Sequence, residues 1–121
     1  MKTILVIDDD DDMRHGIMLT LQSNGYNTIE ADDGVSGLKR IQEEHPDLVV
    51  SDVMMPNMNG YMLLEMVKDD PRTSKIPIML ITGAAFDAGA WKSDNSVAYL
   101  EKPFASEKFI STIERMLKSV L

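Results

Sequence analysis

Five short apolar runs, separated by segments with a different spacing of apolar residues, recur along the chain. The runs lie at Thr3–Ile7, Thr28–Ala31, Leu48–Ser51, Ile78–Thr82 and Val97–Leu100. Near-continuous apolar runs of this length are typical of strands that are buried on both faces. The pattern therefore predicts five strands inside a parallel sheet.

Apolar residues recur with a helical period in the segments between and after these runs. The four sets are Met13, Ile17 and Leu21; Val35, Leu38 and Ile41; Leu63, Leu64 and Val67; and Phe109, Ile110, Ile113, Met116, Leu117 and Val120. We expect Asn24–Gly25 to end the first helix and Ser106 to be the N-cap of the last. The segment from Gly83 to Ser96 has little apolar stripe to bury. The sequence predicts up to five helices, and the fourth, in this segment, is expected to be short or irregular.

Strand and helix patterns alternate through the whole chain, with short connections. Such alternation predicts right-handed parallel crossovers and hence an α/β fold, a doubly wound five-stranded parallel sheet with helices on both faces. The 121 residues fit one domain over residues 1–121, because a second core has no room.

The charge balance excludes several classes of partner. A net charge of -8 argues against direct binding to nucleic acid or to anionic membrane surfaces, since both need an excess of Lys and Arg. There is no cysteine, and the first apolar run is too short for a signal peptide or a membrane span. The expected location is the cytoplasm.

Candidate chemistry collects where the predicted strands end, which is where ligands bind in doubly wound sheets. The residues at these ends are Asp8, Asp9, Asp52, Thr82 and Lys102. Clustered carboxylates repel one another unless a cation neutralises them, and Mg²⁺ prefers oxygen ligands together with a phosphate oxygen. Lys102 and the Thr82 hydroxyl could then hold a phosphoryl group, with Asp52 as the nucleophile.

Four motifs in this order and spacing resemble those of bacterial two-component response regulator receiver domains of the chemotaxis-regulator type. The motifs are I-D-D at Ile7–Asp9, D-V-M-M-P-N-M-N-G at Asp52–Gly60, I-T-G at Ile81–Gly83 and Y-L-E-K-P-F at Tyr99–Phe104. The resemblance covers essentially the whole chain and implies a flavodoxin-like strand order of 2-1-3-4-5.

The resemblance also implies a function in phosphorelay signalling. Asp52 would accept a phosphoryl group from the phosphohistidine of a sensor histidine kinase or phosphotransfer protein, or from a small phosphodonor. Asp9, Asp52 and the backbone carbonyl of Met54 would bind Mg²⁺, for which Mn²⁺ can substitute, and Asp8 would act through water. The chain would be a phosphoacceptor and not a turnover enzyme, and would control a partner protein or a linked output domain that the sequence does not identify.

Further roles follow from the same resemblance. Thr82 and Tyr99 would form the conformational switch, and Lys102 would hold a phosphoryl oxygen. The Lys102–Pro103 peptide bond is expected to be cis. Met54 and Ala84 occupy the two variable pocket positions, and since neither can position an attacking water, slow autodephosphorylation is expected.

Some features depart from the family or have simpler interpretations. Ala88–Ala90 (A-G-A) comes early between Thr82 and Tyr99, so the output surface is expected to differ from that of other receivers. Asp10, Asp11 and Asp12 are interpreted as a solvated capping turn. Most methionines are expected to face the core, with Met55 and Met58 as exceptions.

Three other functions fit the sequence less well. A phosphatase of the haloacid dehalogenase type needs Thr or Val where Asp12 stands, and would be longer than this chain. A flavodoxin-type electron carrier needs a phosphate-cradling loop where five aspartates occur. A receiver that acts by contact without phosphorylation would not need the complete pocket.

Overall fold

The computed structural model describes residues 1–83 and 96–119. Strands and helices alternate in the order β1 (Thr3–Ile7), α1 (Asp11–Ser23), β2 (Asn27–Ala31), α2 (Gly34–Glu44), β3 (Leu48–Asp52), α3 (Gly60–Asp69), β4 (Ile78–Thr82), β5 (Val97–Glu101) and α4 (Ser106–Ser119). All five strands are parallel, in the order β2-β1-β3-β4-β5. The predicted fold class and strand order are confirmed.

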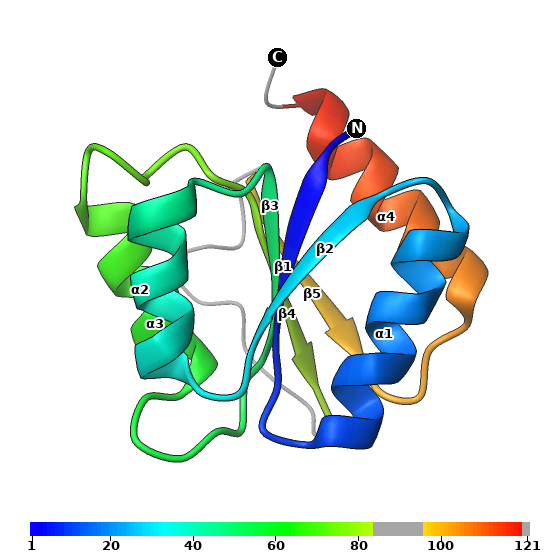
Figure 1. Ribbon diagram of the computed structural model, residues 1–121, viewed down its shortest axis with the longest axis horizontal. Helices are drawn as coiled ribbons and strands as arrows, with labels where there is room; N and C mark the ends of the chain where they lie inside the picture. The colour runs from blue at the N-terminus through cyan, green and yellow to red at the C-terminus, as the bar shows by residue number, and fades with distance from the viewer. Residues whose placement is uncertain (84–95, 120–121) are drawn as a thin grey trace.

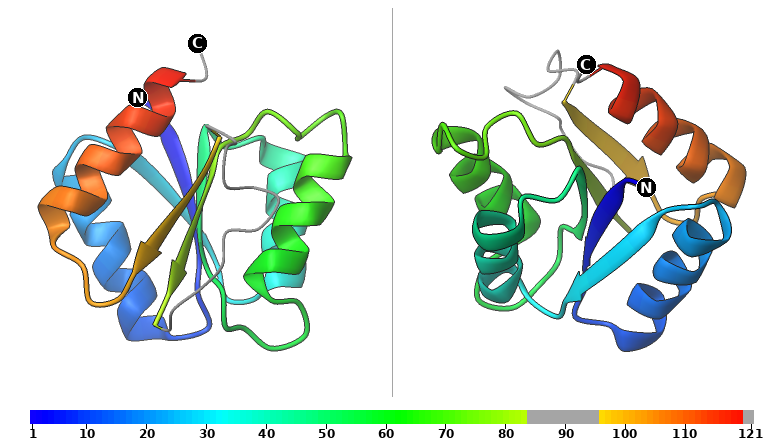
Figure 2. Two further views of the ribbon diagram at one scale, coloured as in Figure 1. Left: turned by 180° about the vertical axis from the view of Figure 1, so that it is seen from behind. Right: turned by 45° about the horizontal axis from the view of Figure 1, so that its top comes forward.

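The helices cover both faces of the sheet (Figures 1 and 2). On one face α1 and α4 pack against strand residues such as Ile4, Val6 and Met79, and on the other α2 and α3 pack against Leu5, Ile7 and Leu80. Successive strand residues thus point to opposite cores. Each fully buried aliphatic side chain contributes about 1.5–3 kcal/mol to stability, which explains the continuous apolar runs.

The apolar stripe predicted for α2 is partly wrong. Val35 is 56% exposed, and the buried face of the helix carries Gly34, Gly37 and Ile41. A Cβ at Gly37 would lie only 2.5 Å from Cδ1 of Ile7. The helix therefore lies so close to β1 that glycine takes the place of an apolar side chain.

The helix ends agree in part with the sequence predictions. Asn24 is the C-cap of α1 and Gly25 follows with φ of +88°, as expected. Ser106 is the first residue of α4, not the residue before the helix. Residues 84–95, where a short or irregular helix is expected, lie outside the described ranges.

The methionine prediction also needs correction. Met55 and Met58 pack against the core beside α2 and α3 and are not exceptions. The exposed methionines include Met54, Met62 and Met66.

Among the described residues, no helix is both long and apolar enough to span a membrane.

The strand register brings the predicted site residues to one edge. Ile7 is paired with Ser51, so Asp8 follows β1 directly beside Asp52 at the end of β3. Thr82, at the end of β4, is paired with Glu101, so Lys102 follows β5 beside it. All these positions lie at the carboxyl edge of the sheet.

Candidate functional site

The backbone around Asp52 is fixed by its neighbours on both sides. Val53 N–H donates to the carbonyl of Ile81 at 2.9 Å, and Gly60 N–H donates to the carbonyl of Val53 at 2.9 Å. A Cβ at Gly60 would lie 2.8 Å from the Asp52 carbonyl oxygen, so the start of α3 approaches the end of β3 as closely as glycine allows. Asp52 is 9% exposed, so little of this residue reaches solvent.

Three carboxylates meet at this point. One oxygen each of Asp8, Asp9 and Asp52 lies within 4.8 Å of the others. Asp8 is buried and Asp9 is exposed, so the cluster spans the boundary between the core and solvent. Oxygen-only donors at this spacing fit a hard divalent cation such as Mg²⁺, which keeps several waters and needs few carboxylates.

The surroundings of Asp8 favour the neutral form of its carboxyl group. Burial raises the pKa of Asp8, and the neighbouring Asp52 charge raises it further. A hydrogen bond from Asp10 N–H to Asp8 Oδ1 at 3.0 Å and the charge of Lys102 act in the opposite direction but do not cancel this effect. A bound cation would remove the repulsion.

Lys102 supplies a positive charge from the opposite side of the cluster. Its Nζ lies 3.7 Å from Oδ2 of Asp52, and its backbone N–H donates to the Thr82 carbonyl at 2.7 Å. The Lys102–Pro103 bond is cis, in agreement with the prediction. At 3.7 Å the pair is an ion pair without a short hydrogen bond, which leaves Lys102 able to reach another anion.

The remaining predicted residues lie around this cluster. Thr82 is 4% exposed, and Tyr99 is half-buried against the core beside α2 and α3. Met54 N–H donates to Asp52 Oδ1 at 3.3 Å, while the Met54 side chain is 73% exposed. Ala84 and Ala88–Ala90 lie outside the described residues.

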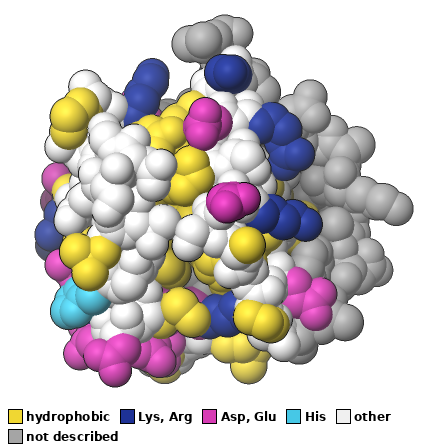
Figure 3. All heavy atoms as spheres, turned by 90° about the vertical axis from the view of Figure 1, so that its right-hand side faces the viewer, with side chains coloured by type: hydrophobic (Ala, Val, Ile, Leu, Met, Phe, Trp, Pro, Cys, Tyr) yellow, Lys and Arg dark blue, Asp and Glu magenta, His cyan; other side chains and the backbone are white. Residues whose placement is uncertain are grey.

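The acidic run after β1 supplies Asp8 and Asp9 to the carboxylate cluster and Asp10 to the cap of α1. Asp10 is the N-cap of α1 and accepts hydrogen bonds from Asp12 N–H at 3.0 Å and Met13 N–H at 3.1 Å, as the capping interpretation predicts. Figure 3 looks onto the face formed by α1 and α4, and shows acidic side chains gathered at the left of its lower edge. That edge contains the carboxyl ends of the strands.

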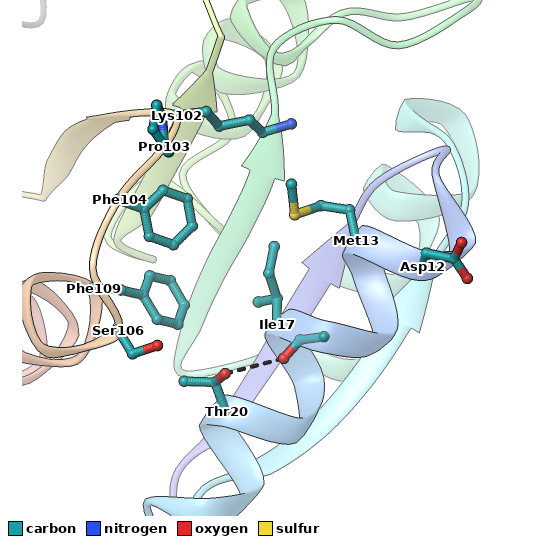
Figure 4. A pocket seen from close by; sticks show the side chains of 10 residues that line it. Asp12, Met13, Ile17, Thr20, Lys102, Pro103, Phe104, Ser106 and Phe109 are labelled. Carbon is teal, nitrogen blue, oxygen red and sulfur yellow. Dashed lines mark hydrogen bonds between the residues drawn. The ribbon is translucent and has the colours of Figure 1, made fainter.

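An apolar cavity of about 350 Å³ lies between α1 and the start of α4, next to Lys102. Met13, Ile17, Phe104 and Phe109 line it, and Lys102 lies at its border (Figure 4). The two phenylalanine rings face each other with centroids 5.6 Å apart and their planes tilted by 33°. An apolar surface therefore lies directly beside the charged site.

The sequence does not predict Arg14 as a site residue. In the structure Arg14 is 7% exposed, and its side chain donates a hydrogen bond to the backbone carbonyl of Asp8. One signal for it exists in the sequence, because Arg14 stands three and seven residues before Ile17 and Leu21, on the apolar stripe of α1. A charge at such a position needs a partner.

Known proteins with similar sequences and structures share this architecture. A model of the response regulator receiver domain family matches residues 4–114. The response regulator receiver protein CpdR from Brucella abortus is 38% identical over 120 residues, which cover 97% of this chain and 98% of CpdR. The DNA-binding dual master transcriptional regulator RpaA from Synechocystis sp. is 31% identical over 126 residues, which cover 98% of this chain and 50% of RpaA.

Solved structures agree with these matches. The signal receiver domain of a signal transduction histidine kinase from Syntrophus aciditrophicus has a TM-score of 0.87 at 28% identity, covering 99% of this chain and 92% of that chain. This chain spans half of RpaA but almost all of CpdR. The matches come from a family of signalling domains and not from a classical enzyme family. The chain belongs to the response regulator receiver domain family of two-component signalling proteins.

Proposed function

We propose that Asp52 is the phosphoacceptor of this receiver domain, in a reaction that depends on Mg²⁺. The observation that carries the proposal is the position of its carboxylate, with Asp8 and Asp9 oxygens within 4.8 Å and the Lys102 Nζ at 3.7 Å. Phosphoryl transfer depends mainly on positioning and charge stabilisation. A nucleophilic carboxylate within a cation site, with the Lys102 ammonium beside it, meets both needs.

The transfer follows from the chemistry of these groups. An Asp52 oxygen attacks phosphorus in line, the new O–P bond forms, and the P–N bond to the donor imidazole breaks with its electron pair leaving on nitrogen. Asp9, Asp52 and the carbonyl of Met54 would hold Mg²⁺, with Asp8 acting through water, and the ion would offset charge on the phosphoryl oxygens. Mn²⁺ can take the same place.

The residues on the Lys102 side would bind the phosphoryl group on Asp52 and start the conformational change. Lys102 leaves its 3.7 Å pairing with Asp52 and binds a phosphoryl oxygen, since phosphorylation moves the negative charge outward. The buried Thr82 hydroxyl hydrogen-bonds to another oxygen, and half-buried Tyr99 turns inward behind it. The switch would thus begin at the ends of β4 and β5.

The partners fit the same scheme. The donor is a phosphohistidine on a sensor histidine kinase or phosphotransfer protein, a partner class consistent with the kinase-linked receiver among the similar structures. The phosphorylated form controls a partner protein or a linked output domain. The domain assists its own phosphorylation and does not turn over a substrate.

Intact mass after incubation with acetyl phosphate tests the proposal. Wild type should gain one phosphoryl group with Mg²⁺ and none with EDTA, and Asp52→Asn should gain none under either condition. Asp69→Asn, an exposed change of equal charge at the end of α3, should behave as wild type. Modification of Asp52→Asn at the wild-type level would contradict the assignment of the phosphoacceptor.

The same samples report the lifetime of the phosphorylated form. Met54 has an exposed apolar side chain at a position where a polar group could position water. The phosphoryl group should therefore persist for minutes or longer after the donor is removed, and loss within seconds would contradict slow autodephosphorylation.

A further inference from the structure

A buried guanidinium lies beneath the loop that carries Asp8 and Asp9. Arg14 of α1 donates from Nη1 to the backbone carbonyl of Asp8 at 2.7 Å, from Nε to Glu30 Oε1 at 2.8 Å, and from Nη2 to Asp11 Oδ1 at 2.6 Å. These acceptors come from the end of β1, from β2 and from the first turn of α1. One side chain therefore joins three elements of the chain at the base of the site.

The cost of burying this charge indicates that the arrangement is specific. A guanidinium is seldom as buried as Arg14 unless its donors are satisfied by good acceptors. Its planar fork fits acceptors in fixed directions, which the single ammonium of lysine cannot reproduce. The Arg14 contacts thus define the orientation of the groups that accept from it.

The group with the greatest consequence is the Asp8 carbonyl. Asp8 N–H donates to the Ala31 carbonyl at 3.2 Å, and its own carbonyl accepts from Arg14, so the main chain is held on both sides of this residue. The next peptide nitrogen belongs to Asp9. Because a peptide unit is planar, fixing the Asp8 carbonyl also fixes the direction in which the chain enters Asp9.

We propose that Arg14 is a positioning residue that holds Asp8 and Asp9 in their cation-binding arrangement. The inference rests on the proposed function of the carboxylate cluster as a Mg²⁺ site. Arg14 itself bonds to Glu30, Asp11 and the main chain of Asp8, so its charge is engaged outside the cluster. It shapes the site without supplying a ligand.

Positioning and simple charge effects predict opposite results for removal of Arg14. Loss of a positive charge near an anionic site would by itself strengthen the binding of a divalent cation. Loss of the contact with the Asp8 carbonyl would instead leave the two carboxylates less well placed and weaken binding. The direction of the change in Mg²⁺ affinity therefore separates the two effects.

Mg²⁺ titration by calorimetry of wild type, Arg14→Met, Arg14→Lys and Arg72→Met tests the proposal. Arg72→Met is the matched control, because it removes an equal charge from an exposed side chain that pairs with Asp70. Arg14→Met should weaken Mg²⁺ binding about tenfold or more, the usual effect of losing a group that orients a metal ligand. Arg72→Met should leave the affinity within about twofold of wild type, since exposed charges are well screened.

Arg14→Lys keeps the charge and is the variant expected to retain the fold if Arg14→Met does not. Its Mg²⁺ affinity should also fall, by a smaller factor, while its phosphorylation by acetyl phosphate at saturating Mg²⁺ should recover to near the wild-type extent. Unchanged or tighter Mg²⁺ binding in a folded Arg14 variant would overturn the positioning role alone. Absence of Mg²⁺ binding in wild type would overturn the proposed metal site and this inference with it.

Discussion

Two groups of aspartates lie at the carboxyl edge of the sheet, and their surroundings differ. Asp33 is the N-cap of α2, where its carboxylate accepts hydrogen bonds from the Ser36 backbone N–H at 2.7 Å and the Ser36 hydroxyl at 2.9 Å. These bonds lower the pKa of Asp33. Asp8 is buried beside Asp52, and burial followed by the Asp52 charge raises its pKa. One residue type therefore stabilises the fold at one position and opposes it at the other.

The difference separates acids that serve the fold from acids available for chemistry. The charge of Asp33, like that of the α1 cap Asp10, is offset within its own helix by backbone donors. Asp8 instead lies buried in a cluster with Asp9 and Asp52, and burial, followed by the Asp52 charge, raises its pKa despite the Asp10 N–H and Lys102. Only the second group should respond to a divalent cation.

The largest test of this comparison is Asp9→Asn. The substitution replaces an exposed carboxylate of the cluster with a neutral amide. Since even groups that orient a ligand are worth about 10- to 100-fold in metal affinity, Mg²⁺ binding should weaken at least about tenfold, or about 1.4 kcal/mol. Calorimetric titration measures the change. Asp69→Asn serves as the control with equal charge, and an equal loss of affinity in both variants would mean that only net charge matters.

The sequence could predict the site because strand ends could be predicted. Strands buried on both faces leave continuous apolar runs, so the positions just after them, Asp8 and Asp52, can be identified from the sequence alone. Lys102 follows the edge strand β5, which still has a short apolar run. Distances such as 3.7 Å between Lys102 and Asp52 were not predictable, because they depend on the loops after β3 and β5. Topology follows from the pattern, and the geometry of the site does not.

The errors have a similar origin. Apolar periodicity placed Val35 on the buried face of α2, because it does not recognise a face built from Gly34 and Gly37. Arg14 escaped prediction because its partner Glu30 is 16 residues away, and their pairing depends on how α1 packs beside β2. Both cases involve contacts between elements, which the spacing of residues along one element does not contain.

Asp8→Asn should have a smaller effect, on stability in the absence of metal. Because the folded-state pKa of Asp8 is raised, the folded protein loses stability as the pH rises from the ordinary aspartate value through the folded value. At neutral pH the variant should be more stable than wild type, on the order of 1 kcal/mol, the usual size of a single-residue effect. Asparagine retains an oxygen to accept from Asp10 N–H.

Urea unfolding at two pH values in EDTA measures this gain. The advantage of Asp8→Asn should shrink as the pH falls below about 4, where aspartate is protonated in both states. Added Mg²⁺ should also reduce the difference in unfolding free energy between the variant and wild type, since a ligand that binds only the folded state stabilises wild type. A variant less stable than wild type at neutral pH without metal would show that the Asp8 charge is well compensated.

The smallest expected effect is that of Asp33→Asn, the counterpart in the other group. Asparagine can still cap α2, so only the interaction of the charge with the helix terminus is lost, about 0.3–1 kcal/mol before screening at this solvent-facing position. The pKa of Asp33 is lowered by its hydrogen bonds, so this stability is present above the ordinary aspartate pKa and is lost as the pH falls through the folded value. Urea unfolding should therefore show a small loss at pH 7 that disappears in acid, once the pH lies below the folded-state pKa of Asp33, the reverse of the sign expected for Asp8→Asn. Mg²⁺ should leave the difference unchanged, and a Mg²⁺-dependent difference would mean that Asp33 belongs electrostatically to the cluster.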